Sequence, residues 1–208
     1  MGKPTAERVM AVDAPTGTDV VELAFAVTGG RLPWDHSFAL WQALELAAGW
    51  LAEDEATAVL PIRAASAGNQ GLVLGRHSRL LIRLREARVE AALALCGKRL
   101  DLAGVPVEVG SAKTRPLSPH ATLYSHRVAA QSDDEAGFVR QVTGELARLG
   151  IHSEFIVGKR ASVRGLDREL AGFSVMLAQL GAQASLKLQA AGLGAHRRLG
   201  FGVFVGHR

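Results

Sequence analysis

The sequence contains one cysteine, one tyrosine and few aromatic residues of any kind, 5% of its 208 residues. A single cysteine, Cys96, excludes an internal disulfide framework. Because 48% of the residues are nonetheless hydrophobic, the core must consist mainly of leucine, valine and alanine. The chain also lacks a run of about 18 uncharged apolar residues, and residues 1–13 lack the apolar segment of a secretion signal. We therefore expect a globular, cytoplasmic protein without a membrane span.

Acidic residues are missing from two long segments. None lies between Glu55 and Glu86, and none follows Glu169. The first of these segments carries five arginines, which are Arg63, Arg76, Arg79, Arg83 and Arg85. With a net charge of +4, this segregation predicts a positive face suited to a polyanion such as RNA. The alternative is an arginine-rich surface without a ligand.

Metal-binding patterns are missing as well. The sequence has no HExxH, no CxxC and no His/Cys pair at the spacing of metal ligands. We expect neither a metal nor another cofactor.

Hydrophobic periodicity and turn residues divide the first half into strands and helices. Asp35 is predicted to cap the first helix, and Gly97 to end the second. The side chains of the second helix that we expect in the core are Val89, Ala92, Leu93 and Cys96. The predicted elements are strands at 20–27, 58–65, 78–84 and 100–109, helices at 36–52 and 85–96, and a linker at 116–119.

The second half repeats this order. Ser132 and Glu135 form an S-x-x-E capping box at the start of its first helix, which Gly150 ends. The buried stripe of that helix is predicted to be Phe138, Val142, Leu146 and Leu149. The predicted elements are strands at 121–130, 153–163, 169–180 and 203–205, the middle two joined around Gly165, and helices ending at 149 and covering 182–191.

Each half thus has the order β-α-β-β-α-β. We predict an α+β fold of two tandem ferredoxin-like (RRM-like) domains. The expected division is an N-terminal tail at 1–17, a first domain at 18–115 and a second domain at 116–208.

A doubled glycine pattern lies near the C-terminus. Residues 192–202 read G-h-G, five residues, then G-h-G, where h is apolar. Gly192, Gly194, Gly200 and Gly202 let the backbone turn tightly and approach a ligand. His196, Arg197 and Arg198 between them can meet phosphates through charge-assisted hydrogen bonds. A glycine-rich turn before an edge strand is the alternative, and the pattern is not a P-loop, which needs Gly-Lys-Ser/Thr.

With this motif the sequence resembles the RAMP superfamily of CRISPR-associated proteins, whose members carry such a C-terminal glycine loop. Within it the chain is similar to the repeat-processing endoribonucleases, in particular the subtype first named for myxobacterial systems. The resemblance rests on residues 20–27, 35–44, 78–84 and 185–205, and the Asp-His start of the first helix points to the cutting members. It implies two ferredoxin-like domains, cleavage within the CRISPR repeat and continued binding of the product. The implied partners are precursor CRISPR RNA, mature crRNA and other subunits of a surveillance complex.

RNA cleaves itself when its 2′-hydroxyl attacks the adjacent phosphate, so a protein needs only to position the groups, move protons and stabilise charge. His36 is the candidate for proton transfer, because the positive end of a helix dipole favours a neutral imidazole. Free N–H groups at the same helix end could hold the scissile phosphate. Whether His36 is base or acid stays open, and an extended helix cap is the alternative.

Two further residues are candidates for the catalytic site. Ser37 could bind the phosphate or the imidazole, or only cap the helix. Tyr124, the one tyrosine, could stack on a base, assist catalysis or lie buried in its strand. Related enzymes often carry a tyrosine or lysine near the active histidine, where this chain has Phe38 and Trp41, so the second catalytic group stays unassigned.

The remaining basic residues are candidates for RNA binding. Arg79 and Arg83 share one strand face, and Arg85 and Arg88 one side of the following helix. Together they could grip a stem-loop, because A-form RNA is recognised through its phosphates, shape and 2′-hydroxyls. The other candidates are Arg76, Arg127, Lys159, Arg160 and Arg164. A solvated face is the alternative for these residues, and we expect His77, His120, His126, His152 and His207 to be structural or exposed.

Two other functions remain open. A non-catalytic RAMP subunit that only binds crRNA would share the glycine loop and the basic surface. A ferredoxin-like metabolic or assembly protein is the more distant alternative. The basic residues between the two glycine pairs and the two segments without acidic residues argue against it.

Overall fold

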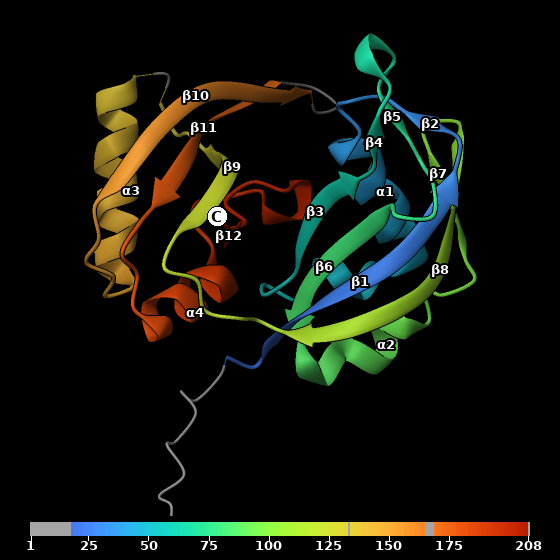
Figure 1. Ribbon diagram of the computed structural model, residues 1–208, viewed down its shortest axis with the longest axis horizontal. Helices are drawn as coiled ribbons and strands as arrows, with labels where there is room; N and C mark the ends of the chain where they lie inside the picture. The colour runs from blue at the N-terminus through green and yellow to red at the C-terminus, as the bar shows by residue number, and fades with distance from the viewer. Residues whose placement is uncertain (1–17, 133, 165–168, 208) are drawn as a thin grey trace, which may run out of the picture.

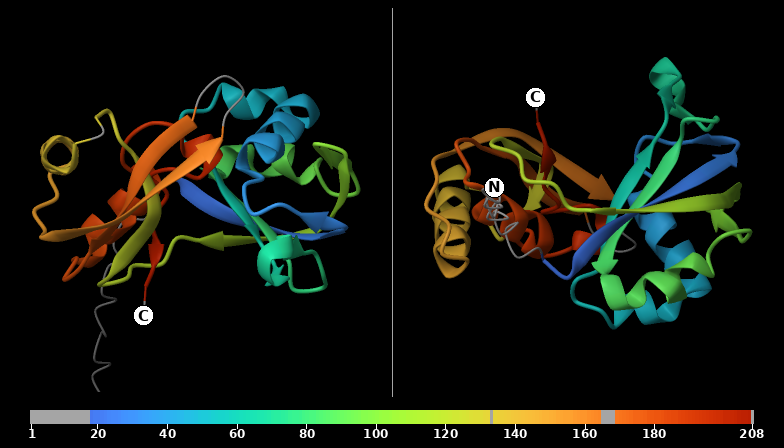
Figure 2. Two further views of the ribbon diagram at one scale, coloured as in Figure 1. Left: turned by 90° about the horizontal axis from the view of Figure 1, so that it is seen from above. Right: turned by 60° about the horizontal axis from the view of Figure 1, so that its bottom comes forward.

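The computed structural model describes residues 18–132, 134–164 and 169–207. They form two antiparallel sheets of five and four strands and a small sheet of three short strands. The larger sheets stand side by side, each with its own helices (Figures 1 and 2).

The first sheet is built from residues 20–116. Its strand order is β3-β6-β1-β8-β7, in which β3-β6-β1-β8 is the antiparallel ferredoxin-like order. Helices α1 and α2 cover one face (Figure 2), and Leu40 and Leu44 of α1 belong to the hydrophobic core under this sheet. The elements are β1 (Val20–Gly29), α1 (Ser37–Ala47), β3 (Ala58–Arg63), β6 (Arg79–Arg85), α2 (Val89–Leu93), β7 (Arg99–Leu102) and β8 (Val105–Pro116).

The second sheet is built from residues 123–206 and has the order β10-β11-β9-β12. Phe138, Val142 and Leu146 form the buried stripe of α3, as the periodicity predicts, and Leu149 is only half-buried. The elements are β9 (Leu123–Ala129), α3 (Glu135–Arg148), β10 (Phe155–Arg164), β11 (Glu169–Leu177), α4 (Ala182–Ala191) and β12 (Val205–Gly206). Both halves have the predicted β-α-β-β-α-β order, so the α+β class with two tandem ferredoxin-like units is confirmed.

The two halves share a hydrophobic core. The cluster under the first sheet also contains Ala129, Val163, Leu199 and Phe201, which belong to the second half. The domain boundary near residue 116 stays a prediction.

The small sheet was not predicted. It consists of β2 (Arg31–Leu32), β5 (Leu72–Val73) and β4 (Ala65–Ser66), in that spatial order. Strands of two residues carry no readable alternation, so the sequence could not reveal it. It projects beside β3 and β1 (Figure 1).

The start of α1 differs from the prediction. His36, not Asp35, is the N-cap, and its side chain makes no capping bond. The Asp35 carboxylate instead accepts the backbone N–H of Arg164 at 2.8 Å. A partner from the other half of the chain thus replaces the local cap. The helix also ends at Ala47, and residues 49–52 form a separate 3-10 turn.

The second predicted helix is shorter than expected. Residues 86–88 form a 3-10 turn, and α2 spans only Val89–Leu93. Because the helix ends there, Leu95 is buried whereas Leu93 and Cys96 are exposed, so Cys96 is not a core residue. Gly97 ends this segment with φ +82°, and the predicted strand at 100–109 is the hairpin of β7 and β8.

In the second half, Asp134 rather than a Ser132–Glu135 box caps α3. Its carboxylate accepts the N–H groups of Ala136 and Gly137, and Ser132 Oγ accepts the N–H of Asp134. Gly150 ends the helix as predicted, with φ +64°, and α4 has the predicted bounds. The junction around Gly165 lies outside the described residues.

Candidate functional site

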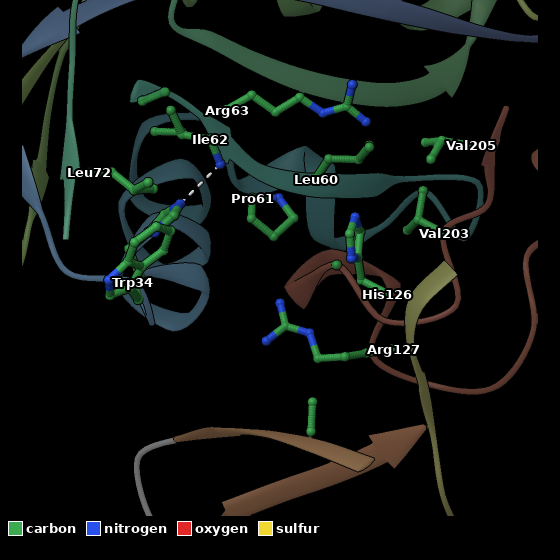
Figure 3. A pocket seen from close by; sticks show the side chains of 14 residues that line it. Trp34, Leu60, Pro61, Ile62, Arg63, Leu72, His126, Arg127, Val203 and Val205 are labelled. Carbon is green, nitrogen blue, oxygen red and sulfur yellow. Dashed lines mark hydrogen bonds between the residues drawn. The ribbon is translucent and has the colours of Figure 1, made fainter. Parts of the chain in front are cut away.

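A cavity of about 480 Å³ opens between β3 of the first sheet and β9, β12 and the glycine segment of the second half (Figure 3). Its wall is largely apolar. The ionisable side chains that line it are His36, Arg63, His126 and Arg127, and Trp34 contributes an aromatic ring that is 56% exposed. Two imidazoles and two guanidiniums make this a site for an anion, and the exposed indole offers a surface on which a base could stack.

His36 is buried at this cavity, with 2% of its surface exposed. Its Nε2 accepts the backbone N–H of Ile62 at 2.9 Å, which Figure 3 shows as a dashed line. The proton of the neutral ring is therefore on Nδ1, which donates to the Pro33 carbonyl at 3.0 Å. Burial lowers the pKa of His36, against the opposing influence of its backbone hydrogen bonds and of Asp35. The ring is thus neutral, and both of its nitrogens are bonded to backbone.

Arg127, on β9, connects the helix start with the glycine segment. Its Nη2 donates to Ser37 Oγ at 3.5 Å, and its guanidinium lies 5.3 Å from the centre of the Phe201 ring. Burial lowers the pKa of Arg127, which Asp35 partly offsets. Within the described part of the chain, its buried Nε has no hydrogen-bond partner. Arg127 therefore keeps donor capacity for a ligand in the cavity.

His126 and Arg63 were not among the predicted site residues. His126 precedes Arg127 on β9, and its ring stands edge-on to Tyr124 at a centroid distance of 4.9 Å. Burial lowers the pKa of His126, and the charges of Arg63, Arg127 and His207 lower it further. Tyr124 and His126 are two residues apart on one strand face, and this spacing is the signal that could have linked them.

Arg63 comes from the end of β3, where a bulge between Leu60 and Arg63 interrupts the pairing with β6. Bulges re-aim side chains, and Arg63 reaches into the same cavity as His126 (Figure 3). Alternation along the strand could not have predicted this direction.

The prediction that Arg83 binds RNA is wrong. Its side chain is 2% exposed, and its Nε pairs with Glu22 at 3.2 Å. Its Nη1 donates to the carbonyls of Gln189 at 3.0 Å and Phe204 at 2.6 Å. The C-terminal segment covers this face of β6, so Arg83 joins the two halves and faces no solvent.

The other arginines around β6 do not form one patch. Arg79 stands at the start of the strand, bonded to the carbonyls of Arg76 and Ser78, and Arg85 stands at its end. They are six positions apart, about 20 Å along a strand. Arg76 is exposed and donates to His77, whereas Arg88 lies over the Trp50 ring at 5.5 Å.

The glycine motif makes close contacts with its own backbone. All four glycines have positive φ, from +63° to +81°. A Cβ on Gly192 would lie 2.6 Å from the Gly202 carbonyl oxygen, and one on Gly202 would overlap the carbonyl of Leu193. The Gly202 N–H also donates to the Arg127 carbonyl at 2.6 Å. The motif therefore positions Arg127 at the cavity.

The three basic residues between the glycine pairs contact other parts of the protein. Arg197 donates to the Ala190 carbonyl at 2.7 Å, and burial, with the charge of Arg83, lowers its pKa to about 10. Arg198 donates to the Ala52 carbonyl and lies 5.4 Å from the centre of the Trp41 ring. His196 stands edge-on to Phe201. Their binding of phosphate stays a prediction.

Lys159, Arg160 and Arg164 are exposed on β10. The bond between the Arg164 N–H and Asp35 places the end of β10 beside the start of α1, and Ala161 of the same strand lines the cavity. The positive charges of these three residues therefore lie along a strand that borders the cavity.

The described part of the chain lacks two kinds of feature. Among the described residues, no three His, Cys, Asp or Glu side chains gather as metal ligands would. None of the helices in the described ranges has the length and hydropathy of a membrane span.

The burial of a neutral His36 predicts a loss of stability in acid. Its folded pKa lies below the ordinary 6.5, so the unfolded chain binds a proton more readily. The neutral His36 makes its full contribution to the free energy of unfolding above about pH 6.5. Below this pH the free energy of unfolding falls by at most about 1.4 kcal/mol per pH unit, until the pH reaches the folded pKa. Urea unfolding between pH 7.5 and 5.5 should show a shallower pH slope for His36→Gln than for the wild type. Equal slopes would contradict a buried neutral imidazole.

Comparisons with known proteins identify the family. The model of the family described as "Cas6 Crispr" matches residues 21–208. The CRISPR-associated endonuclease Cas6 of Myxococcus xanthus (strain DK1622) is 32% identical over 186 residues, 89% of this chain and 80% of that protein.

Solved structures share the fold at low identity. One described as a Cas6-related gene product from Pyrococcus furiosus has a TM-score of 0.62 at 14% identity, over 89% of this chain and 98% of that one. A RAMP protein described as binding different RNA substrates has a TM-score of 0.62 at 12% identity, over 88% and 98%. With the family match over nearly its whole length, the chain belongs to the Cas6 family of CRISPR-associated proteins.

Proposed function

We propose that this protein is an endoribonuclease that cuts precursor CRISPR RNA within the repeat and retains the mature crRNA. The cut is metal-independent: the 2′-hydroxyl attacks the adjacent phosphate, leaving a 5′-hydroxyl and a 2′,3′-cyclic phosphate. The relative from Myxococcus xanthus is named an endonuclease, which supports the activity. The cell compartment of this reaction is the cytoplasm.

The observation that carries this proposal is the cavity that brings together two imidazoles and two guanidiniums. Imidazoles move protons near neutral pH, and guanidiniums stabilise the extra charge of a phosphorane. These groups suffice for attack by an internal hydroxyl.

His36 is assigned proton donation to the leaving 5′-oxygen. A phosphate bound in the cavity favours the imidazolium, because an opposite charge raises the pKa of a base. Protonation of Nε2 breaks its bond with the Ile62 N–H, so the imidazolium turns away from Ile62 before its new N–H reaches the leaving oxygen. Ser37 and Arg127, which contact each other, hold the phosphate, and Tyr124 orients the neighbouring His126 ring.

The exposed basic residues bind the repeat outside the cavity. Lys159, Arg160 and Arg164 lie on the strand beside it, and Arg76, Arg79, Arg85 and Arg88 offer further phosphate contacts. Other subunits of a surveillance complex are the expected protein partners of the retained product.

The test is cleavage of a CRISPR repeat RNA by the purified protein in EDTA. We expect specific cutting by the wild type and none of an RNA with 2′-deoxyribose at the cut site, which lacks the nucleophile. We expect none by His36→Gln, because glutamine accepts the Ile62 N–H but transfers no proton. Cutting that needs added metal, or that survives the 2′-deoxy substitution, would contradict the mechanism. Cutting by His36→Gln at the wild-type rate would show that His36 only binds the Ile62 N–H of β3 and transfers no proton.

One observation favours a second function. Both ring nitrogens of His36 are bonded to backbone, which leaves neither nitrogen free for proton transfer and fits a protein that binds crRNA without cutting it. Tight, salt-sensitive binding of the repeat without cleavage would support that alternative.

A further inference from the structure

The second imidazole of the cavity differs from His36 in exposure and bonding. His126 lies on β9 at the cavity wall with its ring exposed. Among the described residues its recorded contact is the edge-on packing with Tyr124, and no hydrogen bond to either ring nitrogen is found. The ring is therefore oriented by packing, and it lines the cavity with both nitrogens unbonded within the described part of the chain.

The charges around His126 fit a reacting phosphate. Figure 3 shows Arg63 from β3 on one side of the ring and Arg127 from β9 on the other. Both guanidiniums line the same cavity as the imidazole, so a phosphate bound there lies among all three side chains. Cations at these positions favour a phosphate and its developing negative charge.

We propose that His126 is the general base of the cleavage reaction, taking the proton from the attacking 2′-hydroxyl. This inference deepens the proposed function and rests on it. It supplies the second proton-transfer group that the sequence left unassigned.

The reaction balances with these two histidines. The 2′-oxygen forms a bond to phosphorus as its proton passes to His126, and the bond from phosphorus to the 5′-oxygen breaks as that oxygen takes a proton from His36. Proton exchange with water then restores both rings. Arg63 and Arg127 bind the non-bridging oxygens, and Trp34 at the rim stacks on a flanking base.

The environment of His126 favours its neutral form. The groups that face it are Arg63 from β3, Arg127 and Tyr124 from β9, and His207 after β12. Burial and the nearby positive charges lower the pKa of His126. The ring is thus unprotonated at neutral pH and can accept a proton, and the cleavage rate should fall as acid protonates it.

The experiment compares single-turnover cleavage of the repeat RNA by the full-length wild type, His126→Ala, His126→Gln and His152→Ala. His152 is an exposed histidine outside the cavity and serves as the matched control. Binding of the uncleavable 2′-deoxy RNA and thermal unfolding are measured for each variant, so that lost affinity or lost folding is separated from lost chemistry.

We expect both His126 variants to cut about 100-fold more slowly or worse, the usual effect of losing a general base, with binding within about threefold of the wild type. Added imidazole should restore part of the activity of His126→Ala in proportion to its neutral form, and His152→Ala should cut normally. Cleavage by both His126 variants within about threefold of the wild type would overturn the inference while leaving the nuclease intact. Slower cleavage without imidazole rescue and with an unchanged acid limb of the pH profile would also overturn it. A wild type that does not cut in EDTA would overturn the proposed function and this inference together.

Discussion

Replacing Arg83 with methionine should lower the free energy of unfolding by about 3–5 kcal/mol. The substitution removes one partner of a buried ion pair and leaves Glu22 without its guanidinium. It also leaves the carbonyls of Gln189 and Phe204 without a donor in a place that water does not reach. Urea unfolding measures the loss.

Arg85→Met is the matched control, because Arg85 belongs to the same strand but is 55% exposed and lies 3.8 Å from Asp19 and Asp54. The exposed pair with Asp19 contributes about 0–1 kcal/mol. Asp54 is buried, but it also accepts the backbone N–H of Ala56 and so keeps a hydrogen-bond partner without Arg85. Adding Glu22→Gln to Arg83→Met should recover part of the loss, because it removes the unpaired charge. A loss in Arg83→Met no larger than in Arg85→Met would show that Arg83 is not the link between the halves.

Replacing Gly202 with alanine should also be strongly destabilising, by about 4 kcal/mol or more, or should prevent folding. Its φ of +63° already disfavours a side chain, and a Cβ there would overlap the Leu193 carbonyl. The backbone would have to shift at the point where the Gly202 N–H meets the Arg127 carbonyl. If the protein folds at all, repeat RNA cleavage should fall with it, because Arg127 moves.

Gly194→Ala is the control within the same motif. Gly194 has a similar φ of +70°, but a Cβ there would meet its nearest neighbour, the Ala129 carbonyl, at an ordinary 3.4 Å. The expected cost is the conformational one alone, about 1–2 kcal/mol. Thermal and urea unfolding of the two variants compare the effects directly. Equal losses of unfolding free energy in the two variants would mean that the overlap with the Leu193 carbonyl adds nothing to the cost at Gly202.

Regular elements with strong periodicity could be predicted from the sequence. The helix at 182–191 and the stop at Gly150 follow from local chemistry, since apolar spacing and a left-handed glycine act within a few residues. The order of elements in the two halves then determined the fold class.

Features that depend on distant partners could not be predicted. Asp35 has the chemistry of a helix cap, but the N–H of Arg164, more than one hundred positions away, takes its carboxylate. Arg83 alternates with apolar residues as an exposed side chain would, and only the packing of the C-terminal segment on β6 buries it. The residues next to Asp35 and Arg83 in the sequence do not indicate these long-range contacts.

The candidate site could be predicted in part. The Asp-His start of α1 led to His36 and Ser37, and both lie at the cavity or beside it. His126 and Arg63 lie on strands of different sheets, and they meet only because the two halves pack together. The sequence around each of these two residues contains no pattern that predicts a shared site.

The shared core and the Arg83 bonds also bear on how RNA is admitted. A hinge between the sheets would have to expose Phe201 and Leu199 and strip a buried guanidinium of its acceptors. Separation of the two halves to admit a ligand would therefore break these buried contacts. We therefore expect the proposed RNA substrate to enter a cavity that is already formed, so part of the selectivity among repeats should come from the free energy needed to bend each RNA into it.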